Sequence, residues 1–309
     1  MNTELKPNAL RGMFCTLLGG CFWGFSGNCG QYLFTIHHVD PQWLTVVRMI
    51  TAGLMIVVIT LLRNRRAVQE CFATPKDLLT LIAYGVFGLL LSQYTYLEAI
   101  KATNAGTATV LQYIGPVLVM VLVCVTAKRL PKLHEAISIV LVVIDTFLLA
   151  THGDIHTMVI NSTGLFWGLF AACTLVLYTM LPKKIAPKYG AFMTTGFGTL
   201  IGGLTFFAVI RPWPLLIDLP ITAWLAVAGM ILLGTVAAYP MYLQGVNDLG
   251  PVKASMLASI EPVSAAGISA VWLGSEFVPL DFAGFACILA TVFLLAWPEK
   301  QRESPNEQR

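Results

Sequence analysis

Ten apolar runs, each close to the length that crosses a lipid bilayer, divide almost the whole chain. A helix needs about 20 predominantly apolar residues to span a hydrocarbon core of about 30 Å. Lipid offers backbone amides no hydrogen bonds, so spanning segments must satisfy those amides internally, as helices do. The sequence therefore predicts an all-α integral membrane protein with ten transmembrane helices, at residues 12–34, 42–62, 78–97, 105–126, 134–150, 163–181, 192–210, 221–243, 252–272 and 280–297.

The composition excludes the main soluble classes of protein. Of the 309 residues, 57% are hydrophobic and only 11% are charged, whereas a soluble domain carries about 25% charged residues. So little charge cannot hydrate the surface of a 33.6 kDa globule, which excludes a soluble enzyme, a fibrous protein and a disordered chain. The formal net charge of +3 is too small to indicate a nucleic-acid partner.

Cysteine and histidine give no sign of a metal site, a cofactor or a disulfide. The seven cysteines are scattered through the apolar runs and form no CxxC pair, a pattern typical of small buried side chains. The five histidines lie at the ends of the apolar runs rather than within them. We therefore expect no metal and no cofactor.

The distribution of positive charge predicts how the helices are oriented. Lys and Arg gather in the cytoplasmic loops of membrane proteins. With a cytoplasmic N-terminus, sixteen of the 19 cations lie on the inner side, whereas Lys101 and Arg211 lie outside and Arg48 falls within a span. This alternation predicts cytoplasmic N- and C-termini in a multi-pass protein of the cell (inner or plasma) membrane.

The chain contains an internal repeat. A shift of 146 residues lays Tyr96–Ala150 over Tyr242–Ala296 without a gap, and twelve of the 55 positions are identical. Apolar helices often match by chance, so the fraction of identical positions is weak evidence by itself. The short identical segments Tyr-Leu, Pro-Val and Phe-Leu-Leu-Ala, aligned in the same register, are stronger evidence. These matches divide the chain into a first five-helix repeat at 1–152, a second at 160–298, and a polar cytoplasmic tail at 299–309.

The odd number of spans in each repeat has a functional consequence. Five spans reverse the direction of the chain, so the second repeat must run through the membrane opposite to the first. Many secondary transporters are built from such inverted repeats, with the substrate bound near the middle of the bilayer. The repeat alone therefore favours a transporter that works by alternating access.

The repeated stretches also resemble the EamA family of the drug/metabolite transporter (DMT) superfamily. The resemblance covers nearly the whole chain as two tandem five-helix units, and it rests on Phe22–Gly24, Pro41–Arg48, Ala105–Pro116, Lys253–Val263 and Leu273–Glu276. One departure is visible, since Lys128-Arg129-Leu130 stands where the family has an acidic residue after the fourth span. The resemblance implies export of small metabolites, with amino acids prominent among them, and does not specify the substrate.

Ionisable groups inside membrane spans are costly, so Arg48 and Glu261 are the first candidates for a substrate site. Arg48 lies about 10 Å along the second span, at about 1.5 Å per residue, and its guanidinium could bind a substrate carboxylate. Glu261 lies near the middle of the ninth span and could hold an amine or carry a coupling proton. Each has a structural interpretation too: Arg48 tied to helix-end carbonyls, and Glu261 packed beside a helix kink.

Matched helix kinks predict where the cavity lies. Pro116 and Pro262 correspond in the repeat, and proline removes one helical hydrogen bond, so kinks are expected in the fourth and ninth spans. Further side chains expected to bind substrate beside Arg48 and Glu261 are Trp23, Gln93, Gln112, Trp167 and Tyr239. Trp23 and Trp167 form a matched pair that either stacks on the substrate or packs against glycines.

These features predict a secondary transporter that exports small metabolites, amino acids or related compounds, with a small-molecule substrate, the bilayer and protons as partners. An uncoupled facilitator and a multidrug, sugar or nucleoside carrier of the same fold remain alternatives, and a homodimer stays open. An ATP-driven pump is excluded, because the chain has no GxxxxGK[ST] loop. A membrane enzyme is a remote alternative, because dispersed histidines and one central acid make no catalytic cluster.

Overall fold

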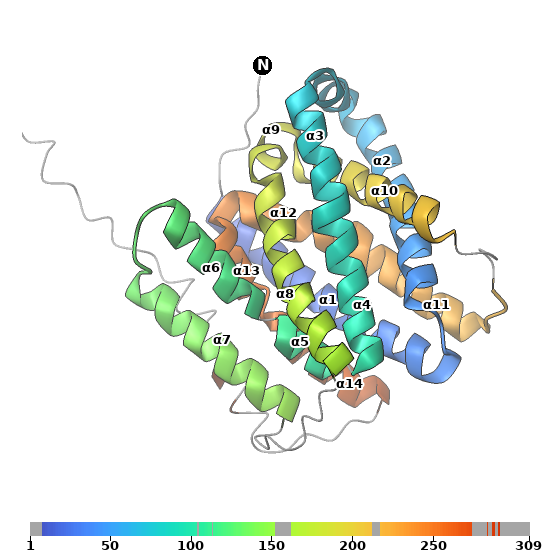
Figure 1. Ribbon diagram of the computed structural model, residues 1–309, viewed down its shortest axis with the longest axis vertical. Helices are drawn as coiled ribbons and strands as arrows, with labels where there is room; N and C mark the ends of the chain where they lie inside the picture. Colours follow the sequence, from blue (N-terminus) through green and yellow to red (C-terminus); the bar gives the residue numbers. More distant parts are fainter. Residues whose placement is uncertain are drawn as a thin grey trace, which may run out of the picture.

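The computed structural model describes residues 8–103, 105–112, 114–151, 162–211 and 217–273, together with residues 283, 286, 287 and 290. Helices joined by short turns make up this part of the chain (Figure 1). The first half contains α1 (Ala9–His37), α2 (Pro41–Ala73), α3 (Pro75–Ala83), the π-helix η1 (Tyr84–Leu90), α4 (Leu91–Ala102), α5 (Ala105–Gln112), α6 (Ile114–Thr126) and α7 (Leu133–Thr151).

The second half follows a similar order, with two short helices, η3 and α9, added after its first long helix. It contains α8 (Ser162–Met180), the 3₁₀-helix η3 (Leu181–Lys184), α9 (Ala186–Tyr189), α10 (Ala191–Ile210), α11 (Ile221–Ile231), the π-helix η4 (Leu232–Ala237), α12 (Ala238–Leu249), α13 (Pro251–Leu257) and α14 (Ile260–Leu273).

Local chemistry explains where several helices begin. The Asn8 side chain caps α1 by accepting a hydrogen bond from the Arg11 amide, and Asp40 caps α2 in the same way through the Gln42 amide. Proline occupies the first position of α2, α3 and α13, where its missing N–H breaks no helical bond. Gly250 precedes α13 with φ of 84°, a conformation that glycine adopts without strain.

Nine of the ten predicted spans coincide with helices, and the tenth, at 280–297, lies almost entirely outside the described residues. Five helical segments are long and apolar enough to cross a membrane, namely Pro41–Ala73, Pro75–Ala102, Ser162–Lys184, Ala191–Ile210 and Ile221–Leu249. Three of the spans are irregular, and only the ninth of these was expected to bend. The third and eighth spans contain π-helical segments, and the ninth is interrupted by a turn at Ala258 and Ser259.

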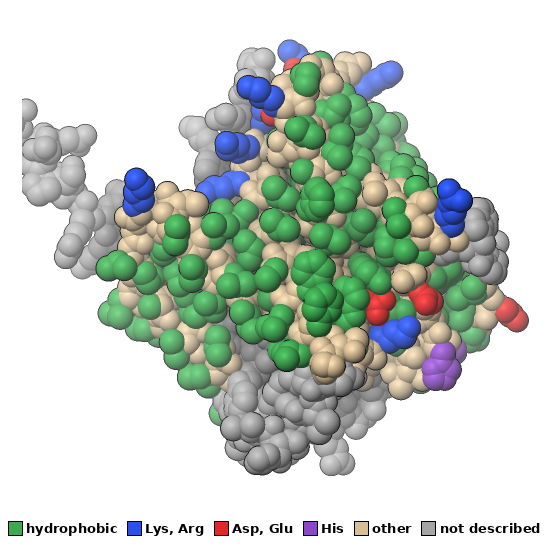
Figure 2. Space-filling view, in the orientation of Figure 1, with side chains coloured by type: hydrophobic (Ala, Val, Ile, Leu, Met, Phe, Trp, Pro, Cys, Tyr) green, Lys and Arg blue, Asp and Glu red, His purple; other side chains and the backbone are tan. Residues whose placement is uncertain are grey.

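The surface is that of a protein immersed in lipid. Apolar side chains cover the middle of the molecule in Figure 2, while Lys and Arg gather at the end where α3 and α9 lie and at the turn between α6 and α7. Large apolar side chains are widely exposed, with Leu62 at 82%, Val209 at 72% and Val125 at 67%. Such exposure would be costly in water and is favourable against lipid tails.

Helices α2 and α10 pack against each other through reciprocal contacts. A Cβ atom added to Gly53 would lie 2.7 Å from the backbone of Leu200, and one added to Gly203 would lie 3.0 Å from the amide nitrogen of Ile50. When the chain is shifted by 150 residues, Gly53 aligns with Gly203 and Ile50 aligns with Leu200. The same contact is therefore made twice, as a two-fold relation between the halves requires.

A π-helix interrupts the corresponding span in each half. Residues 84–90 form η1 and residues 232–237 form η4, and the 146-residue shift found in the sequence lays η1 over 230–236. Short π-helical segments are rare and frequently mark functional sites. The two repeats therefore share a π-helical segment at nearly corresponding positions.

Candidate functional site

A cavity lies between the two halves of the chain. The space between its atoms amounts to about 690 Å³, including its mouth. Its walls come from α1, α2, α4, α5 and α6 of the first half and from α8, α11, α12, α13 and α14 of the second. Any molecule bound there would contact both repeats.

Arg48 from α2 borders this cavity and is only 4% exposed. Its Nε donates a hydrogen bond to Thr235 Oγ1 at 2.6 Å, and its Nη2 donates to the Gly234 carbonyl at 3.3 Å. Both acceptors belong to η4, where Thr235 in turn donates to the Met230 carbonyl at 3.2 Å. The guanidinium also lies 6.0 Å from the centre of the Tyr239 ring. The π-helix therefore fixes the arginine at the cavity wall through neutral oxygens.

The second half has no counterpart of this charge. The 150-residue shift between α2 and α10 places Gly198 where Arg48 lies, and the 146-residue shift places Leu89 where Thr235 lies. A Cβ atom added to Gly198 would lie 2.9 Å from Leu89 Cδ1. One half therefore makes a polar arginine contact where the other makes an apolar one, so the site is chemically asymmetric within a symmetric frame.

Glu261 supplies the carboxyl group of the cavity and is 7% exposed. It lies in the first turn of α14, just after the interruption at Ala258 and Ser259. Tyr96 donates a long hydrogen bond of 3.5 Å to Glu261 Oε1, and the Tyr96 hydroxyl lies 2.9 Å from Thr109 Oγ1. A cation and a carboxyl group therefore border one cavity, from opposite halves of the chain.

Aromatic rings form another wall of the cavity. The Trp23 ring lies 5.2 Å from that of Tyr239, 5.1 Å from that of Tyr242 and 6.3 Å from that of Tyr178. The Tyr178 and Tyr242 rings stack at 5.4 Å. Such rings offer apolar area and π faces to a flat or amphipathic ligand.

The structure brings six of the predicted residues to the cavity and leaves three away from it. Those that line it are Trp23, Arg48, Gln112, Pro116, Tyr239 and Glu261. Gln93 is 2% exposed, and its amide atoms have no hydrogen-bond partner within the described part of the chain. Trp167 packs against Tyr94, with ring centres 5.5 Å apart, so of the two matched tryptophans only Trp23 borders the cavity.

Pro262 is the third predicted residue outside the cavity lining. Instead of bending a continuous helix, it stands third in α14, after the turn that separates α14 from α13. Proline is tolerated there because the first amides of a helix have no intrahelical partner. Pro262 therefore accompanies a break that presents Glu261 at a helix start.

Sequence reasoning did not select three tyrosines that line the cavity. Tyr96, Tyr178 and Tyr242 are polar aromatics on helices α4, α8 and α12. A signal was present for two of them, because the repeat aligns Tyr96 with Tyr242 as identical residues. In the structure both hydroxyls meet a threonine, Thr109 for Tyr96 and Thr179 for Tyr242 at 3.1 Å.

Comparison with known proteins identifies the family. The pattern described as the EamA-like transporter family matches residues 10–151 and again residues 162–297. The chain belongs to the EamA-like transporter family. The family resemblance expected from the sequence is thereby confirmed, and this EamA-like protein is an all-helical membrane transporter with two EamA repeats.

Relatives of this EamA-like transporter occur in distant organisms. The uncharacterized inner membrane transporter YicL of Salmonella typhimurium is 31% identical, over 94% of this chain and 97% of its own. The WAT1-related chloroplastic protein of Arabidopsis thaliana is 23% identical, over 90% of this chain and 67% of its own. A protein of known crystal structure shares the fold with a TM-score of 0.74 at 15% identity, covering 93% of this chain and 96% of its own.

Within the described residues, no group of three or more His, Cys, Asp or Glu side chains is placed to hold a metal ion. The cavity offers a ligand an arginine, a carboxyl group and aromatic rings.

Proposed function

We propose that this protein is a secondary transporter that exports small metabolites, amino acids or related compounds, by alternating access. Ten transmembrane helices would form two inverted five-helix repeats, with both termini on the cytoplasmic side of the cell inner membrane. The observation that carries the proposal is the cavity between the repeats, with Arg48 and Glu261 both at its wall. Two inverted halves around one site give two nearly equal states, each open to one side.

In this proposal Arg48 binds the carboxylate of the substrate. Its guanidinium is permanently charged and is suited to carboxylate recognition. The hydrogen bonds to Thr235 and Gly234 hold it in place before the substrate arrives, which lowers the entropy cost of binding. Glu261 binds the substrate amine or carries a coupling proton, and Trp23, Gln112 and Tyr239 shape the space between them.

Flux in proteoliposomes tests the transport function. A mixed pool of labelled amino acids and small amines is supplied with and without an imposed pH gradient. Selective flux that responds to the gradient supports a coupled transporter, and selective flux that ignores it supports the uncoupled facilitator. Absence of flux would discard amino acids and direct the search to drugs, sugars and nucleosides.

Replacement of Glu261 tests the coupling role separately. We expect Glu261→Gln to abolish accumulation driven by a pH gradient while counterflow exchange survives, because exchange needs the cavity and not the proton. Glu70→Gln is a matched control, since Glu70 forms an exposed pair with Arg66 within one helix. Equal gradient-driven accumulation in wild type and Glu261→Gln would remove Glu261 from coupling.

A further inference from the structure

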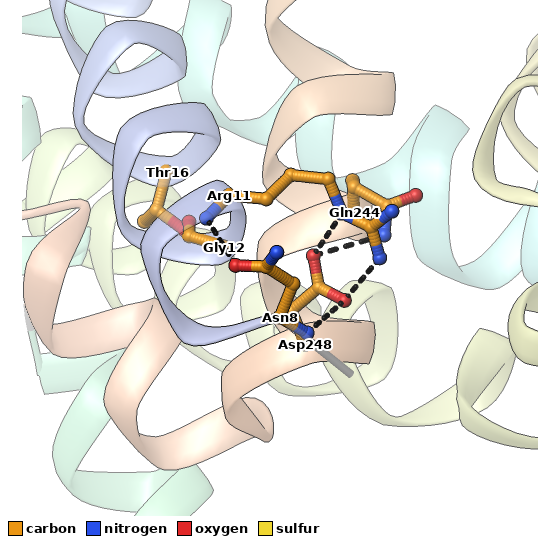
Figure 3. Close-up of polar contacts among 6 residues, drawn as sticks. All are labelled: Asn8, Arg11, Gly12, Thr16, Gln244 and Asp248. Atoms are coloured by element: carbon orange, nitrogen blue, oxygen red, sulfur yellow. Dashed lines mark hydrogen bonds and ion pairs between the residues drawn. The ribbon is translucent and has the colours of Figure 1, made fainter. Parts of the chain in front are cut away.

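A polar cluster joins the start of α1 to the end of α12, and so joins the two halves of the chain (Figure 3). The Asp248 carboxylate accepts hydrogen bonds from Arg11 Nε at 2.8 Å and from Arg11 Nη2 at 2.6 Å. It accepts two more, from the Asn8 amide at 3.2 Å and from Gln244 Nε2 at 3.0 Å. We call these four residues the Asp248 cluster.

The surroundings of the cluster favour a strong interaction. The Asp248 side chain is 2% exposed and that of Arg11 is 34% exposed, so the carboxylate is largely withdrawn from water. Bidentate pairing of arginine with carboxylate is among the stronger hydrogen-bonded arrangements. The Asn8 side chain meanwhile accepts from the Arg11 amide at 3.1 Å, so the helix cap and the ion pair hold each other in place.

Small residues bring α1 and α12 close together at this level. A Cβ atom added to Gly12 would lie 2.7 Å from Asp248 Cβ, and one added to Gly245 would overlap Thr16 Oγ1. Thr16 is fully buried in this seam. The two helices therefore leave no room for a substrate between them at the Asp248 cluster.

The same two helices line the cavity further along. Trp23 from α1 and Tyr239 and Tyr242 from α12 form part of its wall. Arg11 precedes Trp23 by 12 residues, which is about 18 Å along a helix at about 1.5 Å per residue. The seam between α1 and α12 thus runs from the cavity to the Asp248 cluster, and opening it would connect the cavity with that end of the molecule.

A second ion pair between the halves lies at the same end. Lys188 Nζ of the second half lies 2.7 Å from Asp77 Oδ2 of the first, and the Tyr189 hydroxyl donates to the same oxygen at 2.6 Å. This is the end where Lys and Arg gather in Figure 2, which the positive charge assigns to the cytoplasm.

The opposite end of α1 is joined to the second half by neutral groups. Tyr32 donates a hydrogen bond of 3.2 Å to Thr222 there. The 146-residue shift places Ala102 where Asp248 lies, so the repeat provides no carboxylate at the corresponding outer position. Within the described residues, the ionic contact between α1 and α12 therefore lies at the end that carries Asp248.

We propose that the Asp248 cluster is the latch of the cytoplasmic gate, closed in the conformation described here and broken each time the cavity opens to the cytoplasm. The inference rests on the alternating-access function proposed above and adds the residues that set the balance between its two states. Removing either charge leaves the other without its partner at the seam and favours the cytoplasm-open state.

Access to the seam tests the latch directly. A Thr16→Cys reporter is placed in a chain whose own cysteines are replaced by serine, and a membrane-impermeant maleimide is added to the cytoplasmic face of proteoliposomes. We expect slow labelling with the latch intact. Asp248→Asn and Arg11→Gln should each raise the labelling rate about tenfold or more, because each removes a charge-assisted hydrogen bond. Glu70→Gln should leave the rate unchanged.

A charge exchange and a salt titration complete the test without relying on one variant. The double change Arg11→Asp and Asp248→Arg should return labelling toward the slow rate. In the chain with the latch intact, higher ionic strength should speed labelling, because salt screens a partly exposed ion pair. A labelling rate that is the same in wild type and in both single variants, and at low and high salt, would refute the latch. Labelling needs no substrate, so labelling that responds to the variants while no flux is found would support the latch and count only against the amino-acid substrates of the proposed function.

Discussion

Arg48 is a charged side chain in an apolar interior, held there by two neutral oxygens of a π-helix. That support explains how a costly charge persists near the middle of a membrane protein. It also leaves the arginine oriented toward the cavity before any ligand binds.

Replacing Arg48 tests its role in substrate recognition. We expect Arg48→Gln to weaken binding of carboxylate substrates roughly tenfold to a hundredfold, because a hydrogen bond to a charged group contributes about 1.5–3 kcal/mol. Binding is measured as the half-saturating concentration in counterflow. Arg66→Gln is the control, since the Arg66 side chain is 78% exposed. An unchanged half-saturating concentration in Arg48→Gln would leave Arg48 with a structural role only.

The pKa of Asp248 sets the pH below which the Asp248 cluster loses its ion pair. Burial acts to raise that pKa, but hydrogen bonds from Arg11, Gln244 and the Asn8 amide outweigh burial and lower it. A lowered carboxyl pKa adds stability above the ordinary value of about 4 and loses it as the pH falls through the lowered value. Among the titratable groups, Arg11 acts on this pKa through its hydrogen bonds and through its charge.

We therefore expect the Asp248 contribution to be constant from pH 8 to about pH 5. The difference in Tm between wild type and Asp248→Asn, measured in detergent, should stay level over that range and shrink only in stronger acid. A difference that already falls between pH 7 and 6 would contradict this account of the carboxylate.

The sequence identified the charged residues and Tyr239 at the cavity and missed three of its four tyrosines, for a physical reason. Arg48 and Glu261 stand out because an ionised group inside a span needs an explanation. Tyr178 does not stand out, because an aromatic residue in an apolar helix faces lipid, core or cavity equally well. Which of these it faces depends on the rotation of each helix, which Trp167 shows by packing beside Tyr94.

At the scale of elements, helix contacts depend on glycines where backbones meet. We expect Gly53→Ala to destabilise the protein by about 1–3 kcal/mol, the usual cost of overpacking, because the new methyl would press on the Leu200 backbone 2.7 Å away. Gly267→Ala is the matched control, since a Cβ atom there meets nothing within 4 Å. The measurement is the thermal unfolding of both variants in detergent, and equal Tm values would refute close packing at Gly53.

The positions of the helices were predictable, and their irregularities were not. Apolar runs and proline or charged breaks gave nine helical ranges that the structure contains. The π-helices at 84–90 and 232–237 are not marked by any apolar run, proline or charged break. The turn at Ala258 and Ser259 was foreshadowed by Pro262, but only as a bend.

At the scale of the whole molecule, the proposed orientation makes opposite ends accessible from opposite sides. Single cysteines at Lys101 and at Lys183, in a chain otherwise free of cysteine, should react with impermeant maleimide from opposite faces of the membrane. Lys101 should react from outside and Lys183 from the cytoplasm, because the positive-inside bias places them there. Reaction of both from the same face would refute the inverted arrangement of ten spans.

In the proposed mechanism, the presence of Arg48 and Glu261 in one cavity also determines how membrane voltage acts on the carrier. With both groups ionised and a zwitterion bound, the loaded site has no net charge and its reorientation does no electrical work. The empty site with Glu261 protonated has one positive charge, for which 100 mV corresponds to about 2.3 kcal/mol. The rate of counterflow should therefore not change when a potassium-diffusion potential is imposed. The rate of net flux driven by protons should change with that potential. Under the proposed coupling, voltage therefore acts on the return of the empty protonated carrier, and movement of the loaded site carries no charge across the membrane.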